Sequence, residues 1–415
     1  MEYGLLGEKL GHSYSPLIHR VLGGYDYRLC PVSTEELDRL LRSRDFKGLN
    51  VTIPYKKTVI PYADSVSPAV RQVGSANTLF IRDGLLYADN TDLMGFQEML
   101  GRAGITLKGK KAVILGSGGT SLTARAACEL GGAREIVTVS RKGPVDYDAM
   151  YRSHTDAEVL INATPVGMYP NNLVSPVDLS AFKALSGVAD VIYNPCRTAL
   201  ILDAIDRGIP HTDGLIMLVA QAWHASALFM GRYPDREKLA EAYRAVRADT
   251  LSVVLVGMPG SGKTTLGAMV AEALGREAID LDREIEKAAG MTIPEIFAQK
   301  GEKAFRDLES ELIRDKCKLS GKVISTGGGA VMRDENIRAI RQNSLVVQIK
   351  RPVELLPTDG RPLSKDTDRL RRMESERAPF YARCADAAID NLGTPREAAD
   401  KILEVFYEAV GLERA

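Results

Sequence analysis

The stretch LSVVLVGMPGSGKTTL, residues 251–266, decides the fold of the last part of the chain. An apolar run of strand length leads into a glycine-rich turn and then into a sequence that favours a helix. Gly257, Gly262, Lys263 and Thr264 fit the pattern G-x-x-x-x-G-K-[ST], in which backbone amides surround a polyphosphate, the lysine meets its outer phosphates and the hydroxyl reaches Mg²⁺. The sequence therefore predicts an ATP-type site with Mg²⁺. Two further loop residues are assigned to it: Gly260 and Thr265.

Length and charge limit the remaining possibilities. A chain of 415 residues is long enough for two or three domains, so a complete fold should precede residue 251. Lysine plus arginine equals aspartate plus glutamate, 54 against 54, so no overall field attracts nucleic acid or anionic lipid. We expect small-molecule substrates, no nucleic-acid partner and no membrane partner. The oligomeric state stays open, with a homodimer among the options.

The cysteines and the N-terminus indicate the compartment. The five cysteines are scattered singly without a Cys-x-x-Cys motif, which favours a reducing environment and argues against structural zinc. Glu2 stands where a signal peptide would be basic, so we expect a cytoplasmic protein. The apolar segment 215–230 is shorter than the ~20 residues of a membrane span and contains Gln221 and His224, so it favours a buried helix.

Residues 2–100 predict short strands that alternate with helices. The segment 25–32 reads as a strand, and Ser33 with Glu36 forms a capping box for the helix that follows. The segment 48–53 reads as another strand. The Asp83-Gly84 pair predicts a tight hairpin.

From residue 110 the pattern changes to a strand, a glycine turn, a helix and a second strand. This is a βαβ unit, and the apolar runs 157–168 and 187–195 suit further parallel strands. Gly116, Gly118 and Gly119 form a variant of the turn that binds dinucleotides. A Rossmann-type domain is therefore expected here.

The end of the second strand predicts which dinucleotide binds. An NAD site would carry an acidic residue there for the ribose 2′-hydroxyl. This chain has Ser140, Arg141 and Lys142 instead, and their positive charge suits a 2′-phosphate, so we predict NADP. A solvated basic turn without a ligand is the alternative.

Seven motifs in the first 247 residues resemble, in order and spacing, those of shikimate dehydrogenase. They are GEKLGHSYSPLIH (7–19), GLNVTIPYK (48–56), GSANT (74–78), DNTD (89–92), INATPVGM (161–168), DVIYNP (190–195) and DGLIMLVAQA (213–222). The resemblance implies an α/β substrate domain made of residues 1–97 and 213–247, around an NADP-binding domain of residues 98–212.

The same resemblance implies the catalytic pair. Reducing a ketone leaves an alkoxide that needs a proton, and a lysine held by a carboxylate can supply it. Lys56 and Asp92 match the pair in the family. From the sequence alone, Lys56 would be an exposed charge and Asp92 a helix N-cap.

Further positions match the substrate-binding residues of the family. Ser13 and Ser15 correspond to hydroxyls that bind the substrate carboxylate, although Ser15 would also serve as a plain helix cap before Pro16. Gln221 corresponds to a group that hydrogen-bonds the ring hydroxyls, although it could equally be satisfied by a hydrogen bond in the core. His12 is expected to be structural. Thr52 and Asn77 likewise match groups that bind the ring hydroxyls, and Tyr193 matches the tyrosine near the carboxylate.

After the phosphate loop, the segment AIDLDREIEK (278–287) predicts a short strand that ends in two carboxylates. Alternation along a strand would put Asp280 and Asp282 on the same side, at the edge where ligands of open α/β sheets bind. One could hold Mg²⁺ and the other could address the hydroxyl that accepts a phosphoryl group. Ordinary loop carboxylates are the alternative.

Residues 251–415 resemble shikimate kinase through the phosphate loop and the motifs GEKAFRDLE (301–309), STGGGAV (325–331), RPL (361–363) and ERAPFY (376–381). The resemblance implies a parallel-sheet kinase domain. It implies that Lys263, Thr264 and Asp280 serve ATP and Mg²⁺. It also implies that a lid arginine, Arg361, stabilises the transferring phosphoryl group. Four residues would bind shikimate: Asp282, Arg306, Gly328 and Arg377.

One segment departs from the kinase pattern. ELLPTDG, residues 354–360, is shorter than the lid of the family and lacks the arginine that usually precedes the RPL motif. Contact with adenine and exclusion of water by the lid are therefore in question. Arg369, Arg371 and Arg372 are expected on a solvated helix face.

We conclude that the sequence predicts a bifunctional enzyme of aromatic amino acid biosynthesis. NADPH would reduce 3-dehydroshikimate to shikimate, and ATP would then phosphorylate shikimate to shikimate 3-phosphate. The alternative is an NAD-dependent quinate/shikimate dehydrogenase whose kinase-like domain senses ATP without transferring its phosphoryl group.

Overall fold

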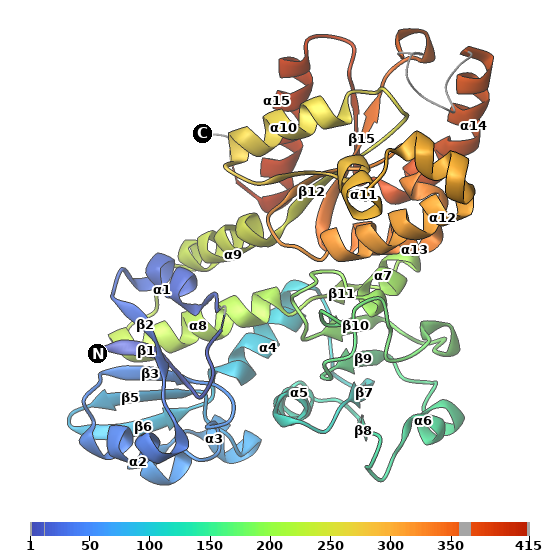
Figure 1. Cartoon of the computed structure of the whole chain (residues 1–415). Coiled ribbons are helices and arrows are strands. Elements are labelled where there is room, and N and C mark those ends of the chain that lie inside the picture. The colour runs from blue at the N-terminus through green and yellow to red at the C-terminus, as the bar shows by residue number, and fades with distance from the viewer. Residues whose placement is uncertain (1, 12, 357–366, 413–415) are drawn as a thin grey trace. The chain divides into compact units, whose positions relative to one another are not determined.

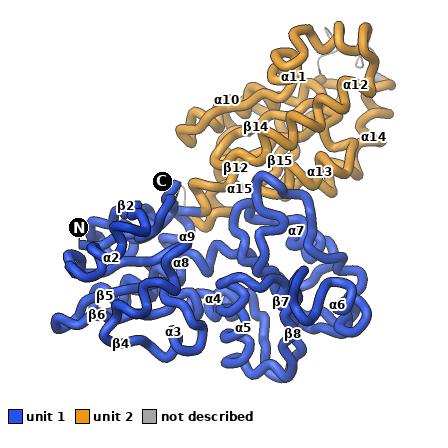
Figure 2. Tube along the Cα trace, turned by 60° about the horizontal axis from the view of Figure 1, so that its bottom comes forward, with its two compact units in different colours: residues 1–246 blue, residues 247–415 orange. Residues whose placement is uncertain are grey.

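The structure, a computed structural model, describes residues 2–11, 13–356 and 367–412. The chain forms two compact units, residues 1–246 (unit 1) and residues 247–415 (unit 2), coloured separately in Figure 2. Unit 1 contains two sheets and unit 2 contains one, and helices accompany all three (Figure 1). The predicted α/β class, with a Rossmann-like domain and a phosphate-loop domain, is confirmed.

The first sheet of unit 1 has six strands in the order β2-β1-β3-β5-β6-β4. The pairs β3·β5 and β5·β6 are antiparallel, and the other pairs are parallel. The predicted hairpin joins β5 to β6, with positive φ at both Asp83 and Gly84, as a two-residue turn of matching twist requires. The predicted capping box of Ser33 and Glu36 begins α2. The elements are β1 (Tyr3–Gly7), α1 (Ser15–Gly23), β2 (Tyr27–Pro31), α2 (Thr34–Ser43), β3 (Gly48–Val51), β4 (Ser65–Val66), α3 (Pro68–Val73), β5 (Thr78–Arg82) and β6 (Leu85–Asp89).

The second sheet of unit 1 has five parallel strands in the order β11-β10-β9-β7-β8. Its strands β7, β9 and β10 are buried along their whole length, which explains their continuous apolar sequences. The predicted strand, glycine turn, helix and strand correspond to β7, α5 and β8. The elements are β7 (Lys111–Leu115), α5 (Gly119–Leu130), β8 (Glu135–Val139), α6 (Tyr147–Ser153), β9 (Val159–Asn162), β10 (Gly187–Asp190), α7 (Ala199–Asp206) and β11 (His211–Thr212).

Two helices, α4 (Thr91–Arg102) and α8 (Leu215–Met230), pack closely between the two sheets of unit 1 (Figure 1). Gly95 permits this approach, because a Cβ there would lie 2.7 Å from the carbonyl oxygen of Met217. The apolar segment 215–230 is thus a helix of unit 1 that packs against α1 and α9 (Arg236–Thr250). Among the described residues, no helix is long and apolar enough to cross a membrane.

Unit 2 has a five-stranded parallel sheet in the order β13-β14-β12-β15-β16. The central strand β12 is fully buried and leads through the phosphate loop into α10. The elements are β12 (Ser252–Val256), α10 (Lys263–Leu274), β13 (Ala278–Asp280), α11 (Leu281–Ala289), α12 (Ile293–Lys316), β14 (Val323–Ser325), α13 (Asp334–Arg341), β15 (Ser344–Lys350), α14 (Thr367–Cys384), β16 (Ala387–Asp390) and α15 (Pro395–Val410).

Candidate functional sites in the two units

A lysine and a carboxylate meet in unit 1. Lys56 lies in the turn after β3, and Asp92 lies in the first turn of α4. Nζ of Lys56 donates a hydrogen bond of 2.6 Å to Oδ2 of Asp92, and the side chains are 32% and 15% exposed. The alternative that Asp92 is the N-cap is wrong, because the side chain of Asn90 accepts from the backbone N–H of Leu93. The carboxylate of Asp92 is therefore available to the lysine.

Asn77 connects this pair to α8. Its Nδ2 donates to Oδ1 of Asp92 at 3.0 Å and to Oε1 of Gln221 at 3.3 Å. Its Oδ1 accepts from the backbone N–H of Thr91 at 2.7 Å, which fixes the orientation of the amide. Four of the predicted residues, from four separate segments, therefore belong to one hydrogen-bonded network. The part played by Thr91 was missed, although the DNTD motif contains it.

Ser13, Ser15 and Tyr193 lie around the start of α1 and its neighbour Tyr14. Oγ of Ser13 accepts from the backbone N–H of Ser15 at 3.2 Å. The expectation that Ser15 caps α1 is wrong, because Tyr14 is the N-cap and makes no side-chain cap bond. Tyr193, in the loop after β10, packs edge-on against Tyr14 with ring centroids 6.4 Å apart. Tyr193 thus contacts the residue that stands between the two serines in the sequence.

Thr52 directly follows β3, and a Cβ at Gly7 would lie 2.7 Å from its Cγ2. The end of β1 and Thr52 are therefore in contact. Within the described residues, no hydrogen bond joins Thr52 to the network of Asn77. His12, which was expected to be structural, lies outside the described residues.

The glycines of the turn after β7 have different roles. Gly116 has φ 113°, and a Cβ there would lie 2.9 Å from the carbonyl oxygen of Ala163, so a side chain would be both strained and crowded. Gly118 and Gly119 open α5, and a Cβ at either would meet nothing within 4 Å. The backbone amides at the start of α5 are therefore accessible to an anion.

Ser140, Arg141 and Lys142 follow β8, which pairs with β7 through Val139 opposite Leu115. The two basic side chains are exposed, and neither forms a hydrogen bond or an ion pair within the described part of the chain. They stand at the same edge of the sheet as the glycine turn. The arrangement suits a phosphate on the ribose of a bound dinucleotide.

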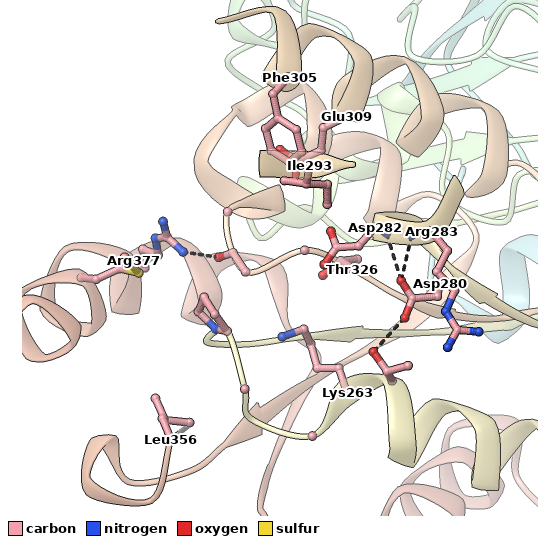
Figure 3. A pocket seen from close by; sticks show the side chains of 18 of the residues that line it. Lys263, Asp280, Asp282, Arg283, Ile293, Phe305, Glu309, Thr326, Leu356 and Arg377 are labelled. Atoms are coloured by element: carbon pink, nitrogen blue, oxygen red, sulfur yellow. Dashed lines mark hydrogen bonds between the residues drawn. The ribbon is translucent and has the colours of Figure 1, made fainter. Parts of the chain in front are cut away.

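Unit 2 contains a cavity of about 920 Å³ bordered by the phosphate loop (Figure 3). Three loop residues, Gly257, Gly260 and Gly262, have φ of 146°, 82° and 102°, values that only glycine adopts easily. Lys263 is 7% exposed, and its Nζ donates to the carbonyl oxygens of Gly257 at 2.9 Å and Met258 at 2.8 Å. The lysine thus lies folded against its own loop. Two more predicted residues line the cavity: Thr264 and Thr265.

The two predicted carboxylates lie on different elements. Strand β13 ends at Asp280, which is the N-cap of α11 and accepts from the backbone N–H groups of Asp282 and Arg283 (Figure 3). The expectation that Asp280 and Asp282 alternate along a strand is therefore wrong, because Asp282 lies in the first helical turn. Oγ1 of Thr264 donates to Oδ2 of Asp280 at 2.8 Å. Both carboxylates nevertheless line the cavity. A hydroxyl and a carboxylate in contact are oxygen ligands of the kind that Mg²⁺ prefers.

Arg306 and Glu309 form a buried pair on α12. NH1 of Arg306 donates to Oε2 of Glu309 at 2.7 Å, and the glutamate side chain is 1% exposed. The pKa of Glu309 is raised above its usual value by burial, and the neighbouring guanidinium of Arg306 offsets only part of this shift. Oε1 of Glu309 has no hydrogen-bond partner in the described residues, and a Cβ at Gly327 would lie 3.0 Å from it. Glu309 was missed, although it is the last residue of the GEKAFRDLE motif and follows Arg306 by three positions.

Arg377 approaches the cavity from α14. Its NH1 donates to the carbonyl oxygen of Gly328 at 2.8 Å, and the hydroxyl of Tyr381 donates to the same oxygen at 2.6 Å. Burial raises the pKa of Tyr381 to about 12, so this hydroxyl keeps its proton. The loop after β14 is thereby held against α14. All four residues predicted to bind shikimate line the one cavity: Asp282, Arg306, Gly328 and Arg377.

The structure describes only some of the arginines in and after the predicted lid. Arg361 and the rest of the RPL motif lie outside the described residues. Arg369, Arg371 and Arg372 are exposed on α14, in accord with the expected solvated face.

Comparisons with known proteins cover both units. The family model for the shikimate dehydrogenase substrate binding domain matches residues 5–79, and the model for shikimate kinase matches residues 259–407. A shikimate dehydrogenase (NADP⁺) of Clostridium perfringens is 36% identical over 265 residues, which cover 59% of this chain and 98% of that protein.

Two solved structures are similar to the same part of the chain. A shikimate dehydrogenase from Peptoclostridium difficile is 35% identical with a TM-score of 0.53, and covers 60% of this chain and 98% of its own. A shikimate 5-dehydrogenase from Thermus thermophilus, in complex with NADP(H) and shikimate, is 30% identical with a TM-score of 0.53, and covers 59% of this chain and 99% of its own.

Proposed function

Because the chain belongs to the shikimate dehydrogenase family in its N-terminal part and carries a shikimate kinase domain in its C-terminal part, we propose that it catalyses two consecutive reactions. In the first, NADPH reduces 3-dehydroshikimate to shikimate. In the second, ATP phosphorylates the 3-hydroxyl of shikimate. The product of unit 1 would be the substrate of unit 2, so the chain is a bifunctional enzyme of the shikimate pathway.

The hydrogen bond of 2.6 Å between Lys56 and Asp92 carries the dehydrogenase proposal. Bound NADPH supplies a hydride to the ketone carbon, and the oxygen of that ketone must then gain a proton. The ammonium of Lys56 donates this proton, and Asp92 stabilises the charged lysine beforehand. Asn77 and Gln221, which are bonded to each other, present polar groups to the ring hydroxyls, while Ser13, Ser15, Thr52 and Tyr193 serve the rest of the substrate.

The charge on the turn after β8 supports NADP as the first cofactor. Arg141 and Lys142 are exposed cations without a protein partner among the described residues. They would bind the 2′-phosphate, with Ser140 beside them, and the amides near Gly116, Gly118 and Gly119 would bind the pyrophosphate.

The residues around the cavity of unit 2 support the kinase reaction. Thr264 and Asp280 would hold Mg²⁺, which neutralises phosphate charge when bound. Lys263 leaves its loop carbonyls for the phosphates, Asp282 accepts the proton of the attacking hydroxyl, and Arg306 and Arg377 bind the carboxylate of shikimate. Arg361 would stabilise the transferring phosphoryl group, and Gly328 would border the ring.

The domain boundaries and the compartment belong to the same proposal. We assign residues 1–97 and 213–247 to the substrate domain, 98–212 to the NADP domain and 251–415 to the kinase domain. The five cysteines all carry free thiols, which supports a cytoplasmic location.

Two assays on the purified full chain test the function. Shikimate-dependent reduction of NADP⁺ reports the first activity in its reverse direction, and shikimate-dependent release of ADP reports the second. Both should be present, and the absence of both would refute the proposal. If NADP⁺ is used no better than NAD⁺, the NAD-dependent quinate/shikimate dehydrogenase becomes the better interpretation. ATP binding without ADP release would instead favour the sensor.

A further inference from the structure

We propose that Arg351 binds the nucleotide of the kinase reaction, on the side of the cavity away from Asp280 and Asp282. The proposal deepens the ATP-dependent half of the function proposed above and rests on it. Arg351 matches none of the motifs that carried the resemblance to shikimate kinase, and four lines of argument point to its role.

The position of Arg351 brings it to the phosphate loop. It directly follows β15, which pairs in parallel with β12, the strand that leads into the loop. The ends of these strands are in close contact, because a Cβ at Gly257 would lie 2.4 Å from the carbonyl oxygen of Ile349. Arg351 lines the same cavity as Lys263. Its side chain therefore borders the space that a bound triphosphate would enter.

The Nε atom of Arg351 lacks a partner in the part of the chain that the structure describes. It is shielded from solvent and has no hydrogen-bond acceptor there. A shielded N–H of a charged group without an acceptor costs free energy, which a ligand that brings an acceptor would recover. Two other arginines of the cavity are already held, Arg306 by Glu309 and Arg377 by the carbonyl oxygen of Gly328.

The order of the strands separates the two substrates. In the sheet of unit 2, the strand order is β13-β14-β12-β15-β16. Strand β13, which ends at Asp280, therefore lies on one side of β12, and β15, which precedes Arg351, lies on the other. Asp280 and Asp282 mark the side of the metal and the hydroxyl acceptor. We infer that the rest of the nucleotide, beyond the phosphoryl group that is transferred, extends from the loop toward β15, where Arg351 lines the cavity. The geometry thus points to a contact between Arg351 and the ADP moiety.

The chemistry of the segment before the RPL motif agrees with this role. Residues 354–360, ELLPTDG, contain no cation, and Lys263 is the one cation of the phosphate loop. A triphosphate carries several negative charges, and a guanidinium binds phosphate oxygens with two parallel hydrogen bonds. Arg351 supplies such a group from a strand end rather than from a loop.

Titration of the full chain with MgADP, together with kinase kinetics, tests the proposal. Arg351→Met should raise the Kd of MgADP and the KM of ATP by roughly tenfold or more, since a charge-assisted hydrogen bond is lost. The KM of shikimate should change less than twofold. The MgADP affinity of Arg351→Lys should fall between those of the wild type and Arg351→Met, because lysine keeps the charge but loses the two parallel hydrogen bonds of the guanidinium. Lys350→Met is the matched control, since Lys350 is the adjacent, exposed cation and does not line the cavity.

Three results would overturn the proposal: an unchanged affinity of Arg351→Met for MgADP, an equal rise in the KM of shikimate, or an equal loss in Lys350→Met. Circular dichroism melting of each variant separates lost binding from lost folding, and Arg351→Lys remains informative if Arg351→Met unfolds. If the wild-type chain binds MgADP but never phosphorylates shikimate, the kinase proposal fails while the titration still decides the role of Arg351.

Discussion

Lys56 and Asp92 lie 36 residues apart in the sequence, and their charged groups lie 2.6 Å apart in the structure. The lysine belongs to the turn after β3 and the aspartate to the first turn of α4, while Asn77 from the start of the hairpin holds the second carboxylate oxygen. The proposed proton donor and its counter-ion thereby come from three segments of the chain. Its contribution can be tested separately from the chemistry of unit 2.

We expect Lys56→Met to lower the kcat of the dehydrogenase reaction by about 10²–10⁴-fold, because the proton donor is removed. Lys57→Met is the control, since Lys57 is the exposed neighbour. NADP⁺ reduction and ADP release are measured on the same preparation. A loss of kinase activity in Lys56→Met would show that the two units do not act independently.

The complementary change is Lys263→Met in the phosphate loop. Lys263 is expected to leave the carbonyl oxygens of Gly257 and Met258 and to bind the phosphates of ATP, so ADP release should fall by at least about 10²-fold. NADP⁺ reduction should stay within twofold of the wild type. Kinase activity close to that of the wild type would contradict the assignment of Lys263.

Glu309 should act on shikimate through Arg306. Glu309→Ala removes the partner that orients the guanidinium, so we expect the KM of shikimate to rise roughly tenfold while the KM of ATP stays nearly constant. Glu309→Gln should be milder, because its amide oxygen can still accept from Arg306. The opposite pattern, with the KM of ATP rising alone, would place Glu309 on the nucleotide side of the cavity.

The cofactor preference should depend on Arg141. Arg141→Gln removes an exposed cation from the predicted 2′-phosphate site, so the ratio of kcat/KM for NADP⁺ to that for NAD⁺ should fall roughly tenfold. Arg152→Gln, on the exposed face of α6, is the control. An unchanged ratio would favour the solvated basic turn.

Two buried groups of unit 1 should affect stability with opposite dependence on pH. Burial lowers the pKa of His19 from 6.5 to about 3 and raises the pKa of Asp190 from 3.8 to about 7. At His19 the unfolded chain binds the extra proton, so stability is lost as the pH falls below 6.5. At Asp190 the folded chain binds the extra proton. Its contribution to stability is therefore complete below about pH 4 and is lost as the pH rises through 7.

These contributions oppose each other between about pH 4 and pH 6.5. In Asp190→Asn the His19 contribution remains, so the free energy of unfolding of unit 1 should increase by about 2 kcal/mol from pH 5 to pH 7. In His19→Phe it should decrease over the same range. Urea unfolding followed by the fluorescence of Trp223 measures unit 1 selectively, because Trp223 is the single tryptophan and lies on α8. The same slope in both variants would contradict the assignment.

The sequence by itself determined the features that depend on neighbouring residues. The phosphate loop needs glycines and a lysine at fixed spacing, the hairpin needs positive φ at Asp83 and Gly84, and the capping box needs Ser33 three residues before Glu36. The long apolar runs likewise predicted strands buried on both faces. Each of these patterns carries its physical cause within a few residues, so it could be read without a fold.

Only the tertiary structure decided which distant groups meet. The bond between Asn77 and Gln221 spans 144 positions, and it exists because α8 packs along α4. Asp282 lies in a helix and not in the predicted strand, because the side chain of Asp280 caps α11. Arg351 lines the cavity beside the phosphate loop because β15 pairs with β12. Strand order and helix packing set these distances through the burial of the whole core, which no local pattern encodes.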